Sequence, residues 1–503
     1  MQQASLATDL PEKDPRADAD RGGGRAARPP LAFVVVAGAF VAAQAVLMMP
    51  GVGLGWDETV YVSQVSPQAP AAFFSAPRAR GISFLVAPVA AFTTSVDVLR
   101  GYLALLSGGA LFLGLQVWRR LLPVPVVALA GALFATLWIT LFYGPQVMPN
   151  LWVAFAALGA TGCFLRAVLD PGDRAARVGL GCAVAVAALM RPTDACWLVA
   201  PLAVAALCVR SWRRPAVLVI LAAGAAAGAS AWVVEAYVSY GGLAARLHRA
   251  GEIQGGLGWH PAFGHQLRAL EGRSLCRPCD MRWRDPATAL WWFALPVLAA
   301  GGVRAAARTP LRAVVLLPAL TGLVLALPYL LTIDYAAARF LLPTYALLAL
   351  PVAFCLCRFV TTARPVLRPM AVAVIAVVLL THGVSQYVTA DRLVSRSRAT
   401  REALARISAE LHRQGVRPPC TVTGNESVRI GFQAGCSSRQ LAGHDGSISR
   451  AGLLELAARQ PLGVLVAPGR PVPGYARGWR SAPLPALPGQ AASRVYLSPP
   501  ARP

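Results

Sequence analysis

The sequence predicts an all-α polytopic membrane protein with about eleven transmembrane helices, followed by a small α/β domain. Hydrophobic residues make up 56% of the 503 residues and charged residues only 14%, whereas soluble domains carry about 25% charged residues. Apolar runs of about 20 residues recur along most of the chain, which is the length that crosses a hydrocarbon core. Between these runs, arginines gather at alternate connections, as the positive-inside rule requires of cytoplasmic loops.

The chain divides into three predicted regions. Residues 1–30 are polar and rich in Gly and Pro, so we expect a disordered cytoplasmic N-terminus. Residues 31–388 form the transmembrane domain, with outer loops at 50–99 and 239–287. The predicted spans are 31–49, 100–118, 123–143, 148–168, 176–190, 195–210, 215–238, 288–303, 311–331, 338–357 and 370–388.

The segment 81–96 is apolar but short for a span, and counting it as one would place every later arginine block outside. We therefore expect it to pack on the outer face. Residues 389–503 then follow an odd number of spans and are predicted to be an extracytoplasmic α/β domain. In this domain "ATREALARISAELHRQ" has helical periodicity, and "CTVTG", "LGVLVAP" and "SRVYLSP" are typical of strands.

The excess of positive charge in the chain is explained by the arginine blocks of the predicted cytoplasmic loops. A formal net charge of +24 would ordinarily raise nucleic acid as a partner. Here the arginines stand in short blocks between spans instead of forming one basic surface. The basicity therefore indicates membrane orientation, and we expect no nucleic-acid partner.

Four of the ten cysteines lie outside the predicted spans, namely Cys276, Cys279, Cys420 and Cys436. An even number in an oxidising compartment favours two disulfides. The pair in "LCRPCDMRW" has CxxC spacing, with His260 and His265 upstream, so zinc is the alternative for that loop. A structural zinc site of this kind wants two such pairs, and only one is present.

The acidic pair Asp57 and Glu58 lies in "GWDETVYVSQ", directly after the first span. An outer loop can carry acids simply for solubility. The flanking aromatic residues, however, are typical of the membrane interface. The second interpretation is therefore a reactive carboxylate at the depth of the lipid headgroups.

Several arginines lie on the same outer side, against the positive-inside bias: Arg78, Arg80, Arg100, Arg191 and Arg339. Guanidinium forks suit an anionic lipid phosphate. Local ion pairing is the alternative, because Asp97 stands three residues before Arg100 and Asp194 three after Arg191.

Glu235 lies near the outer end of a span, in "WVVEAYVSYGG". An acid inside a membrane segment is a functional candidate by default. A structural role as the partner of Arg246 or Arg249 is the interpretation that we favour.

Together these groups suit sugar transfer from a lipid phosphate. A glycoside with a poor leaving group needs two carboxylates, one of them to protonate the leaving oxygen. A phosphate already leaves readily if cations hold it, so one base for the acceptor hydroxyl is then sufficient.

The chain resembles the GT-C membrane glycosyltransferases, in particular the protein O-mannosyltransferase and aminoarabinose transferase branch. The resemblance covers about residues 31–360 and rests on "GWDETVYVSQ", "SAPRARGISFLVAPVAAF", "YGPQVMPNLWVAFAALGA", "ALMRPTD" and "ARFLLPTYALLALP". It implies a polyprenyl-phosphate sugar as donor and a catalytic base at Asp57, with Glu58 beside it. Arg191 and Arg339 match positions that face the lipid phosphate, and we add Arg80 and Arg100 to this predicted set.

Two departures from these families bear on substrate and metal. "RARGISFL" replaces the Lys/Pro-rich stretch of the aminoarabinose transferases, which argues against that sugar. Where many relatives carry an acid in a second outer loop, this chain has Asn150. A neutral amide is a weaker ligand for a hard cation, so a divalent cation is left open as a cofactor.

The predicted function is that of an inverting glycosyltransferase in a bacterial plasma membrane. It moves a sugar from a polyprenyl-phosphate carrier to an extracytoplasmic hydroxyl of a cell-wall glycan, lipid or protein. The alternative is a lipid-carrier flippase or polysaccharide exporter, which would place polar groups at mid-bilayer on broken helices. The predicted spans are nearly free of charge, which favours the enzyme.

Overall fold

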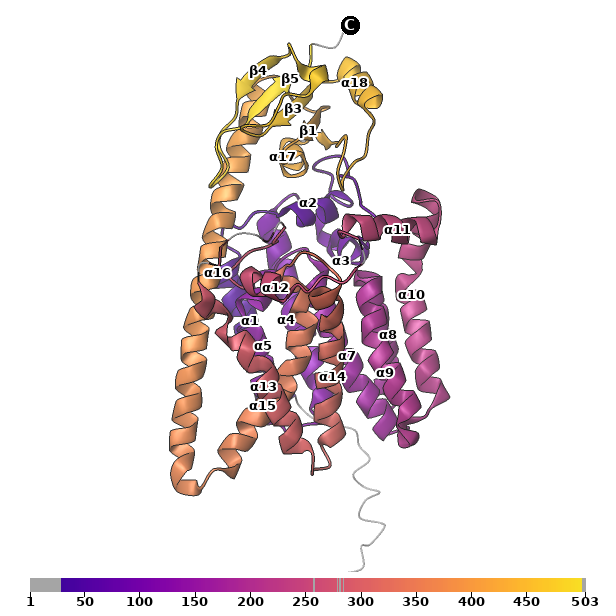
Figure 1. The fold of residues 1–503 in the computed structure, drawn as a ribbon, viewed down its shortest axis with the longest axis vertical. Coiled ribbons are helices and arrows are strands. Elements are labelled where there is room, and N and C mark those ends of the chain that lie inside the picture. The colour runs from indigo at the N-terminus through magenta and orange to yellow at the C-terminus, as the bar shows by residue number, and fades with distance from the viewer. Residues whose placement is uncertain (1–28, 257, 278, 280–281, 284, 500–503) are drawn as a thin grey trace, which may run out of the picture.

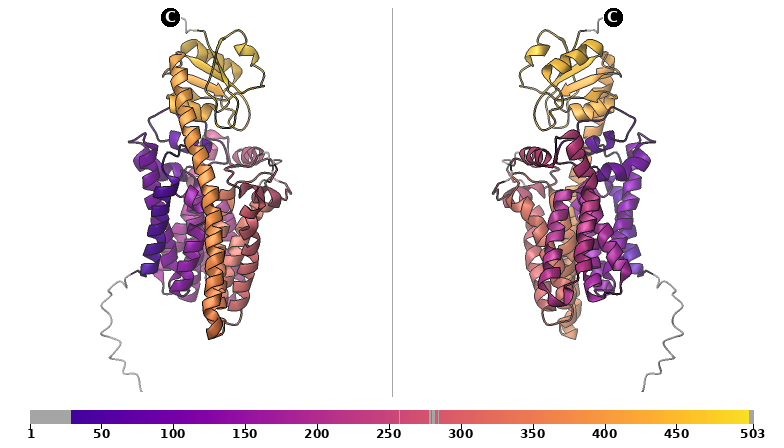
Figure 2. Two further views of the ribbon diagram at one scale, coloured as in Figure 1. Left: turned by 90° about the vertical axis from the view of Figure 1, so that its left-hand side faces the viewer. Right: turned by 90° about the vertical axis from the view of Figure 1, so that its right-hand side faces the viewer.

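A bundle of long helices carries a small α/β domain at one end (Figures 1 and 2). The computed structural model describes residues 29–499 except 257, 278, 280, 281 and 284. The predicted N-terminal disorder therefore falls, for residues 1–28, outside the described residues.

Most helices of the bundle follow one another with short connections, and two long connections, after Met48 and after Ser239, form the outer loops. Their bounds are α1 Leu31–Ala43, which continues as the π-helix η2 Gln44–Met48, α4 Val96–Trp118, α5 Val124–Ala135, α6 Trp138–Tyr143, α7 Pro149–Leu169, α8 Arg174–Met190, α9 Pro192–Cys208, α10 Pro215–Ser239, α13 Leu290–Ala306, α14 Arg312–Leu331, α15 Leu342–Thr362 and α16 Arg368–Arg413. Short helices lie in the predicted outer loops: α2 Trp56–Ser63, α3 Gly81–Ala90, α11 Leu243–Ile253 and α12 Phe263–Ala269.

Local sequence signals explain where many of these helices begin. The side chains of Ser95 and Asp173 cap α4 and α8 by accepting hydrogen bonds from Val98 N and Ala176 N. Prolines occupy the first position of α7, α9 and α10, where no amide hydrogen is needed and the fixed φ suits a helix.

Each of the eleven predicted spans contains a helix. Fewer than eleven of these helical segments, however, are long and apolar enough to cross a membrane. Eight helical segments of the described chain are long and apolar enough to cross a membrane. The predicted spans 123–143, 176–190 and 195–210 correspond instead to the shorter helices α5 with α6, α8 and α9. The segment predicted to lie on the outer face contains α3, whose 10 residues rise only about 15 Å and reach about halfway through a hydrocarbon core.

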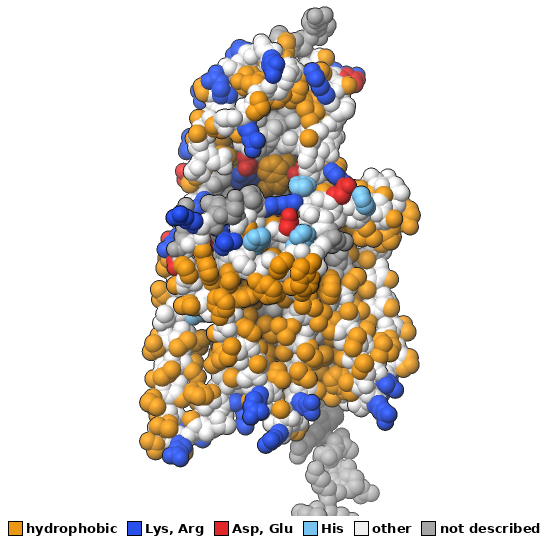
Figure 3. Space-filling model, in the orientation of Figure 1, with side chains coloured by type: hydrophobic (Ala, Val, Ile, Leu, Met, Phe, Trp, Pro, Cys, Tyr) orange, Lys and Arg blue, Asp and Glu red, His pale blue; other side chains and the backbone are white. Residues whose placement is uncertain are grey.

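The core of the bundle lies around α7 and α15. Within their most apolar windows, 89% and 83% of the residues are buried, compared with 22% in α10. The outer helices present apolar side chains outward and form a hydrophobic belt (Figure 3). Arginines gather at the end of the bundle opposite the α/β domain (Figure 3), the distribution expected if that end faces the cytoplasm.

The terminal domain is built on one mixed sheet, which confirms the predicted α/β character. Its strands are β1 Thr421–Gly424, β2 Ser437–Ser438, β3 Leu462–Val466, β4 Arg480–Pro483 and β5 Arg494–Leu497, in the order β2-β1-β3-β5-β4. The strands β2, β1 and β3 are parallel, and β5 runs antiparallel to both β3 and β4. Helices α17 Ser427–Ala434 and α18 Arg450–Arg459 complete the domain.

Helix α16 joins the two regions without a break. It has 46 residues and passes through the boundary predicted at 388/389. Its last turns bury Leu404, Ile407 and Leu411 in one apolar cluster with Val422 and Val495 of the sheet. This helix therefore belongs to both the bundle and the terminal domain.

Candidate active site

Helix α2 carries the acidic pair and begins where the sequence provides its own cap. The backbone amide of Gly55 donates to Glu58 Oε2 over 2.8 Å, and Thr59 Oγ1 donates to Gly55 O over 2.8 Å. Two acids in the first turn also suit the positive end of the helix dipole. Successive helical residues point about 100° apart, so the two carboxylates enter different surroundings.

Asp57 lies between two arginines from distant parts of the chain. Arg78 Nη2 donates to Asp57 Oδ1 over 2.8 Å, and Arg339 Nη2 donates to Asp57 Oδ2 over 3.0 Å. The Asp57 side chain nevertheless stays 35% exposed. Burial would raise the pKa of Asp57, but Arg78 and Arg339 outweigh it, and the pKa lies below its ordinary value. Asp57 is thus an ionised, partly open carboxylate.

Arg78 links this site to the terminal domain. Its Nη1 donates to Asp445 Oδ1 over 3.3 Å and to Ser75 Oγ over 2.5 Å. Asp445 lies in the loop between β2 and α18. A second contact is made beside it, where Gln68 Nε2 donates to Phe432 O of α17 over 3.1 Å. The terminal domain therefore contacts the site directly.

Arg339 lies in the 3-10 turn η5 Ala338–Leu341 at the start of α15 and is held by the long loop. Its Nη1 donates to Ser274 O over 2.5 Å and to Tyr143 Oη over 3.4 Å. Backbone hydrogen bonds between Cys276 and Ala336, of 2.8 and 3.2 Å, tie the loop to the segment before Arg339. Arg339 Nε is buried and has no hydrogen-bond partner among the described residues.

Arg191 forms the local ion pair that its spacing allows. Its Nε donates to Asp194 Oδ2 over 2.9 Å, and its Nη2 donates to Tyr329 Oη over 2.9 Å. The side chain is 21% exposed, and its charge is among those that lower the pKa of Asp57. Arg191 thus keeps a local partner while its charge also acts on Asp57.

Glu58 has surroundings opposite to those of Asp57. It is 3% exposed, and Arg100 Nη2 donates to its Oε2 over 2.9 Å while Arg100 Nη1 donates to its Oε1. Val147 N donates to the same Oε1 over 2.8 Å. With the amide of Gly55, both oxygens have two donors each, so Glu58 is a structural carboxylate and we revise its predicted catalytic role.

The predicted phosphate-binding role of Arg100 requires the same correction. Arg100 is completely buried, and its remaining Nη contacts are to the carbonyl oxygens of Pro145, at 2.8 Å, and Gly53, at 2.7 Å. A lipid phosphate has no access to it. The predicted Asp97–Arg100 pair is also not formed, because Asp97 pairs with Arg401 of α16 over 3.0 Å.

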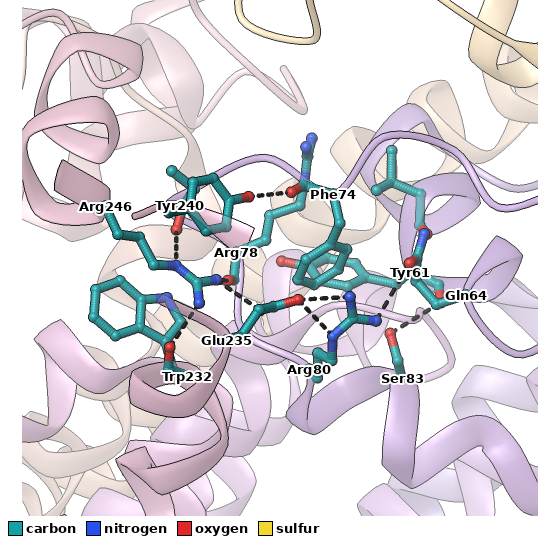
Figure 4. A network of polar contacts seen from close by, with 12 residues as sticks. Tyr61, Gln64, Phe74, Arg78, Arg80, Ser83, Trp232, Glu235, Tyr240 and Arg246 are labelled. Atoms are coloured by element: carbon teal, nitrogen blue, oxygen red, sulfur yellow. Dashed lines mark hydrogen bonds and ion pairs between the residues drawn. The ribbon is translucent and has the colours of Figure 1, made fainter. Parts of the chain in front are cut away.

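Arg80 belongs to a second polar network, in which Glu235 lies between the guanidinium groups of Arg80 and Arg246 (Figure 4). Arg80 Nε and Nη2 donate to Glu235 Oε1 over 2.8 and 2.6 Å, and Arg246 Nη2 donates to Glu235 Oε2 over 2.8 Å. Arg80 is therefore held by a carboxylate, and we withdraw it from the phosphate-binding set. Glu235 is a structural partner of Arg246, whereas Arg249 pairs with Glu252.

The residues around Asp57 do not fit a divalent cation. Both carboxylate oxygens already accept from guanidinium groups, whose charge repels a second cation. Asn150, the second residue of α7, is 1% exposed, and neither the oxygen nor the nitrogen of its amide has a hydrogen-bond partner among the described residues. The described part of the chain also holds no group of three or more His, Cys, Asp or Glu that could hold a metal ion.

The four predicted disulfide cysteines are paired in the structure. Cys276 is joined to Cys279, with Cα atoms 4.9 Å apart, and Cys420 to Cys436, with Cα atoms 4.7 Å apart. The second bridge ties the residue before β1 to the residue before β2. The CxxC thiols are bonded to each other and are not available as zinc ligands.

Two residues of the site were missed or underrated in the sequence. Arg78 was noted among the outer arginines but not assigned to the site, although it stands in the same "SAPRARG" stretch as Arg80. Asp445 has no local signal, since it lies 367 residues from Arg78. Only the docking of the terminal domain brings it to the site.

Comparison with known proteins shows which solved structures have a similar fold. No protein-family model and no curated protein matches the sequence. Among solved structures, ArnT from Cupriavidus metallidurans bound to undecaprenyl phosphate is similar, with a TM-score of 0.67 and 13% identity over 94% of this chain and 99% of that chain. The same protein in the apo state gives a TM-score of 0.62 and 12% identity over 94% of this chain and 98% of that chain.

An oligosaccharyltransferase from Archaeoglobus fulgidus is more distant. It has a TM-score of 0.49 and 13% identity over 86% of this chain and 69% of that chain. At these identities the likeness to ArnT establishes the fold alone. The chain thus has an ArnT-like fold, which confirms the fold that the resemblance seen in its sequence implied.

Proposed function

We propose that this chain is an inverting glycosyltransferase that moves a sugar from a polyprenyl-phosphate carrier to an extracytoplasmic hydroxyl, in a bacterial plasma membrane. The observation that carries the proposal is Asp57, a partly exposed carboxylate between Arg78 and Arg339. The likeness in fold to an ArnT bound to undecaprenyl phosphate supports a polyprenyl phosphate as the carrier.

The arginines around Asp57 can bind the phosphate that leaves in the reaction. Each guanidinium has five N–H donors, and Asp57 takes only one from Arg78 and one from Arg339. The two side chains remain partly exposed, 13% for Arg78 and 8% for Arg339, so the N–H groups at this exposed edge are left for phosphate oxygens. Together with Arg191, these cations stabilise the charge that develops as the sugar–phosphate bond breaks.

Asp57 acts in this scheme as the general base. It takes the proton of the acceptor hydroxyl while the acceptor oxygen forms a bond to the anomeric carbon of the sugar. The bond from that carbon to the phosphate oxygen breaks, and the polyprenyl phosphate leaves with the electron pair. A single displacement of this kind inverts the anomeric configuration.

The positions of the charges support an enzyme over a flippase or exporter. A transporter would be expected to hold polar groups at mid-bilayer on broken helices. The ion pairs of the described residues lie outside the predicted spans or near their ends, such as Arg100 with Glu58 and Arg166 with Asp173. The acceptor, whether glycan, lipid or protein, stays open.

Purified protein in lipid nanodiscs should be incubated with a panel of polyprenyl-phosphate sugars, each labelled in the sugar, together with a cell-envelope extract that supplies glycan, lipid and protein hydroxyls as acceptors. We expect the label to leave one carrier, with the Asp57→Asn variant as the inactive control at matched protein amount. If no carrier is consumed, and reconstituted protein instead moves a labelled carrier between the leaflets of liposomes, the transporter alternative replaces this proposal.

A further inference from the structure

A cavity lies beside the network of Arg80, Glu235 and Arg246, and the reaction proposed above leaves it unused. Its volume is about 410 Å³, within the range of about 300–1,000 Å³ that small-molecule sites occupy. It is lined by the segment Phe73 to Arg80 on one side and by the end of α10 and part of α11 on the other. Figure 4 shows the polar wall of this region.

The polar wall offers fixed donors and acceptors together. Arg80 and Glu235 hold each other through two hydrogen bonds of 2.8 and 2.6 Å, and their side chains remain 33% and 14% exposed. Arg80 also donates to Gln64 Oε1 over 3.3 Å and lies 4.5 Å from the centre of the Phe74 ring. These contacts fix the orientation of both charged groups before any ligand arrives.

Three aromatic residues form part of the remaining wall, beside Ala76, Ser239, Arg249 and Ile253. Phe73, Phe74 and Tyr240 line the cavity, and the Tyr240 hydroxyl donates to Phe74 O. A sugar ring presents hydroxyls at its edge and apolar C–H groups on its faces. An ion pair that offers both donors and acceptors suits the hydroxyls, and aromatic rings suit the apolar faces.

The same segment connects the cavity with the proposed catalytic centre. Arg246, which is completely buried, donates from Nε to Ala76 O over 3.1 Å and from Nη2 to Arg78 O over 3.0 Å. The backbone that brings Phe73 and Arg80 to the cavity thus also delivers Arg78 to Asp57. A ligand in the cavity would lie next to the segment that contacts the base.

We propose that this cavity binds a neutral sugar unit and, resting on the proposed function, that this unit belongs to the acceptor. The transferase then acts on an acceptor glycan, with one sugar ring held against the aromatic side chains and the Arg80–Glu235 pair. The acceptor hydroxyl is presented from there to Asp57.

Binding can be tested without any donor. The probes are methyl glycosides of glucose, galactose, mannose and rhamnose, measured by saturation-transfer NMR on protein in nanodiscs free of sugar detergents. Ser239→Trp fills the rim of the cavity from an exposed position. Val238→Trp is the matched control, because Val238 is 80% exposed and does not line the cavity.

We expect at least one glycoside to bind the wild-type protein and Val238→Trp and to lose at least tenfold in affinity for Ser239→Trp. Absence of binding to the wild-type protein, survival of binding in Ser239→Trp, or equal loss in both variants would overturn the proposal. Donor consumption without glycoside binding would refute the acceptor site alone. Glycoside binding without donor consumption would instead leave the site standing and refute the proposed function.

Discussion

Asp57 and Glu58 are adjacent on α2, yet the structure treats them in opposite ways. Glu58 is 3% exposed and accepts hydrogen bonds from Arg100, Val147 and Gly55. The Asp57 side chain is 35% exposed and, within the described part of the chain, accepts side-chain hydrogen bonds from Arg78 and Arg339. One carboxylate fastens the outer loop to the bundle, and the other stays available for chemistry.

The comparison shows why an acidic pair should not be assigned to catalysis as a unit. A buried carboxylate with all lone pairs satisfied has little capacity left for a substrate proton. A carboxylate held by cations at an open edge keeps both its charge and its access. The two environments therefore predict different effects of substitution. A change at Glu58 should lower the stability of the protein, and a change at Asp57 should lower turnover.

The largest effect is expected for Asp57→Asn, which removes basicity but keeps the shape of the side chain. Turnover of the polyprenyl-phosphate sugar should fall by about 10²–10⁴-fold, the usual contribution of a general base. The measurement is sugar release on protein matched for membrane abundance, with binding of the unglycosylated carrier as a check on the fold. A variant that turns over at the wild-type rate would remove Asp57 from the mechanism.

Glu58→Gln should instead destabilise the protein, because it leaves the Arg100 guanidinium buried without its counter-charge. Removing one partner of a buried pair costs about 3–5 kcal/mol, to be measured as a lower midpoint of thermal unfolding. Turnover per folded molecule should change little. The double variant Glu58→Gln/Arg100→Met removes both charges and should recover part of the loss. Normal stability with abolished turnover would show that Glu58 is the catalytic residue instead.

The two arginines of "PRAR", Arg78 and Arg80, allow the role of Asp57 to be tested through the pH dependence of activity. The ionised form of Asp57 is the active base and its pKa is lowered, so activity should persist below the ordinary titration range of Asp and fall only as pH drops through the lowered pKa. Arg78→Gln removes one cause of the lowering, and the acid limb of kcat/KM should move to higher pH. Arg80→Gln is the matched control for the position of the limb, because Arg80 pairs with Glu235. Only the pH at which kcat/KM falls is compared, since the size of kcat/KM in this variant also reflects the proposed acceptor cavity. An identical limb in wild-type protein and Arg78→Gln would contradict the assignment.

The smallest effect is expected for Asp97→Asn at the exposed contact between α4 and α16. Asp97 and Arg401 are 3.0 Å apart, but their side chains are 60% and 37% exposed. Exposed pairs contribute about 0–1 kcal/mol, so the unfolding midpoint should barely move. A loss comparable with that of Glu58→Gln would mean that exposure does not separate the two kinds of ion pair.

Much of the bundle and of the terminal domain could be predicted from local patterns. Hydropathy located a helix at every predicted span, because a helix in lipid must satisfy its own backbone groups. Short strand-like runs bounded by Gly and Pro turns located β1, β3 and β5. The short, separate helices α5 and α6 were joined into one predicted span, because an apolar run does not reveal where its helix ends.

The sequence by itself determined what each segment is, and the tertiary structure decided which side chains meet. Apolar length, arginine blocks and the resemblance indicated a GT-C membrane protein with Asp57 in its first outer loop. Arg100 had an acid at helical spacing but pairs with Glu58, 42 residues away, and Asp57 meets Arg339 across 282 residues. Helix periodicity encodes only neighbours within a turn or two. Partners at such separations are fixed by how the helices pack and where the terminal domain docks.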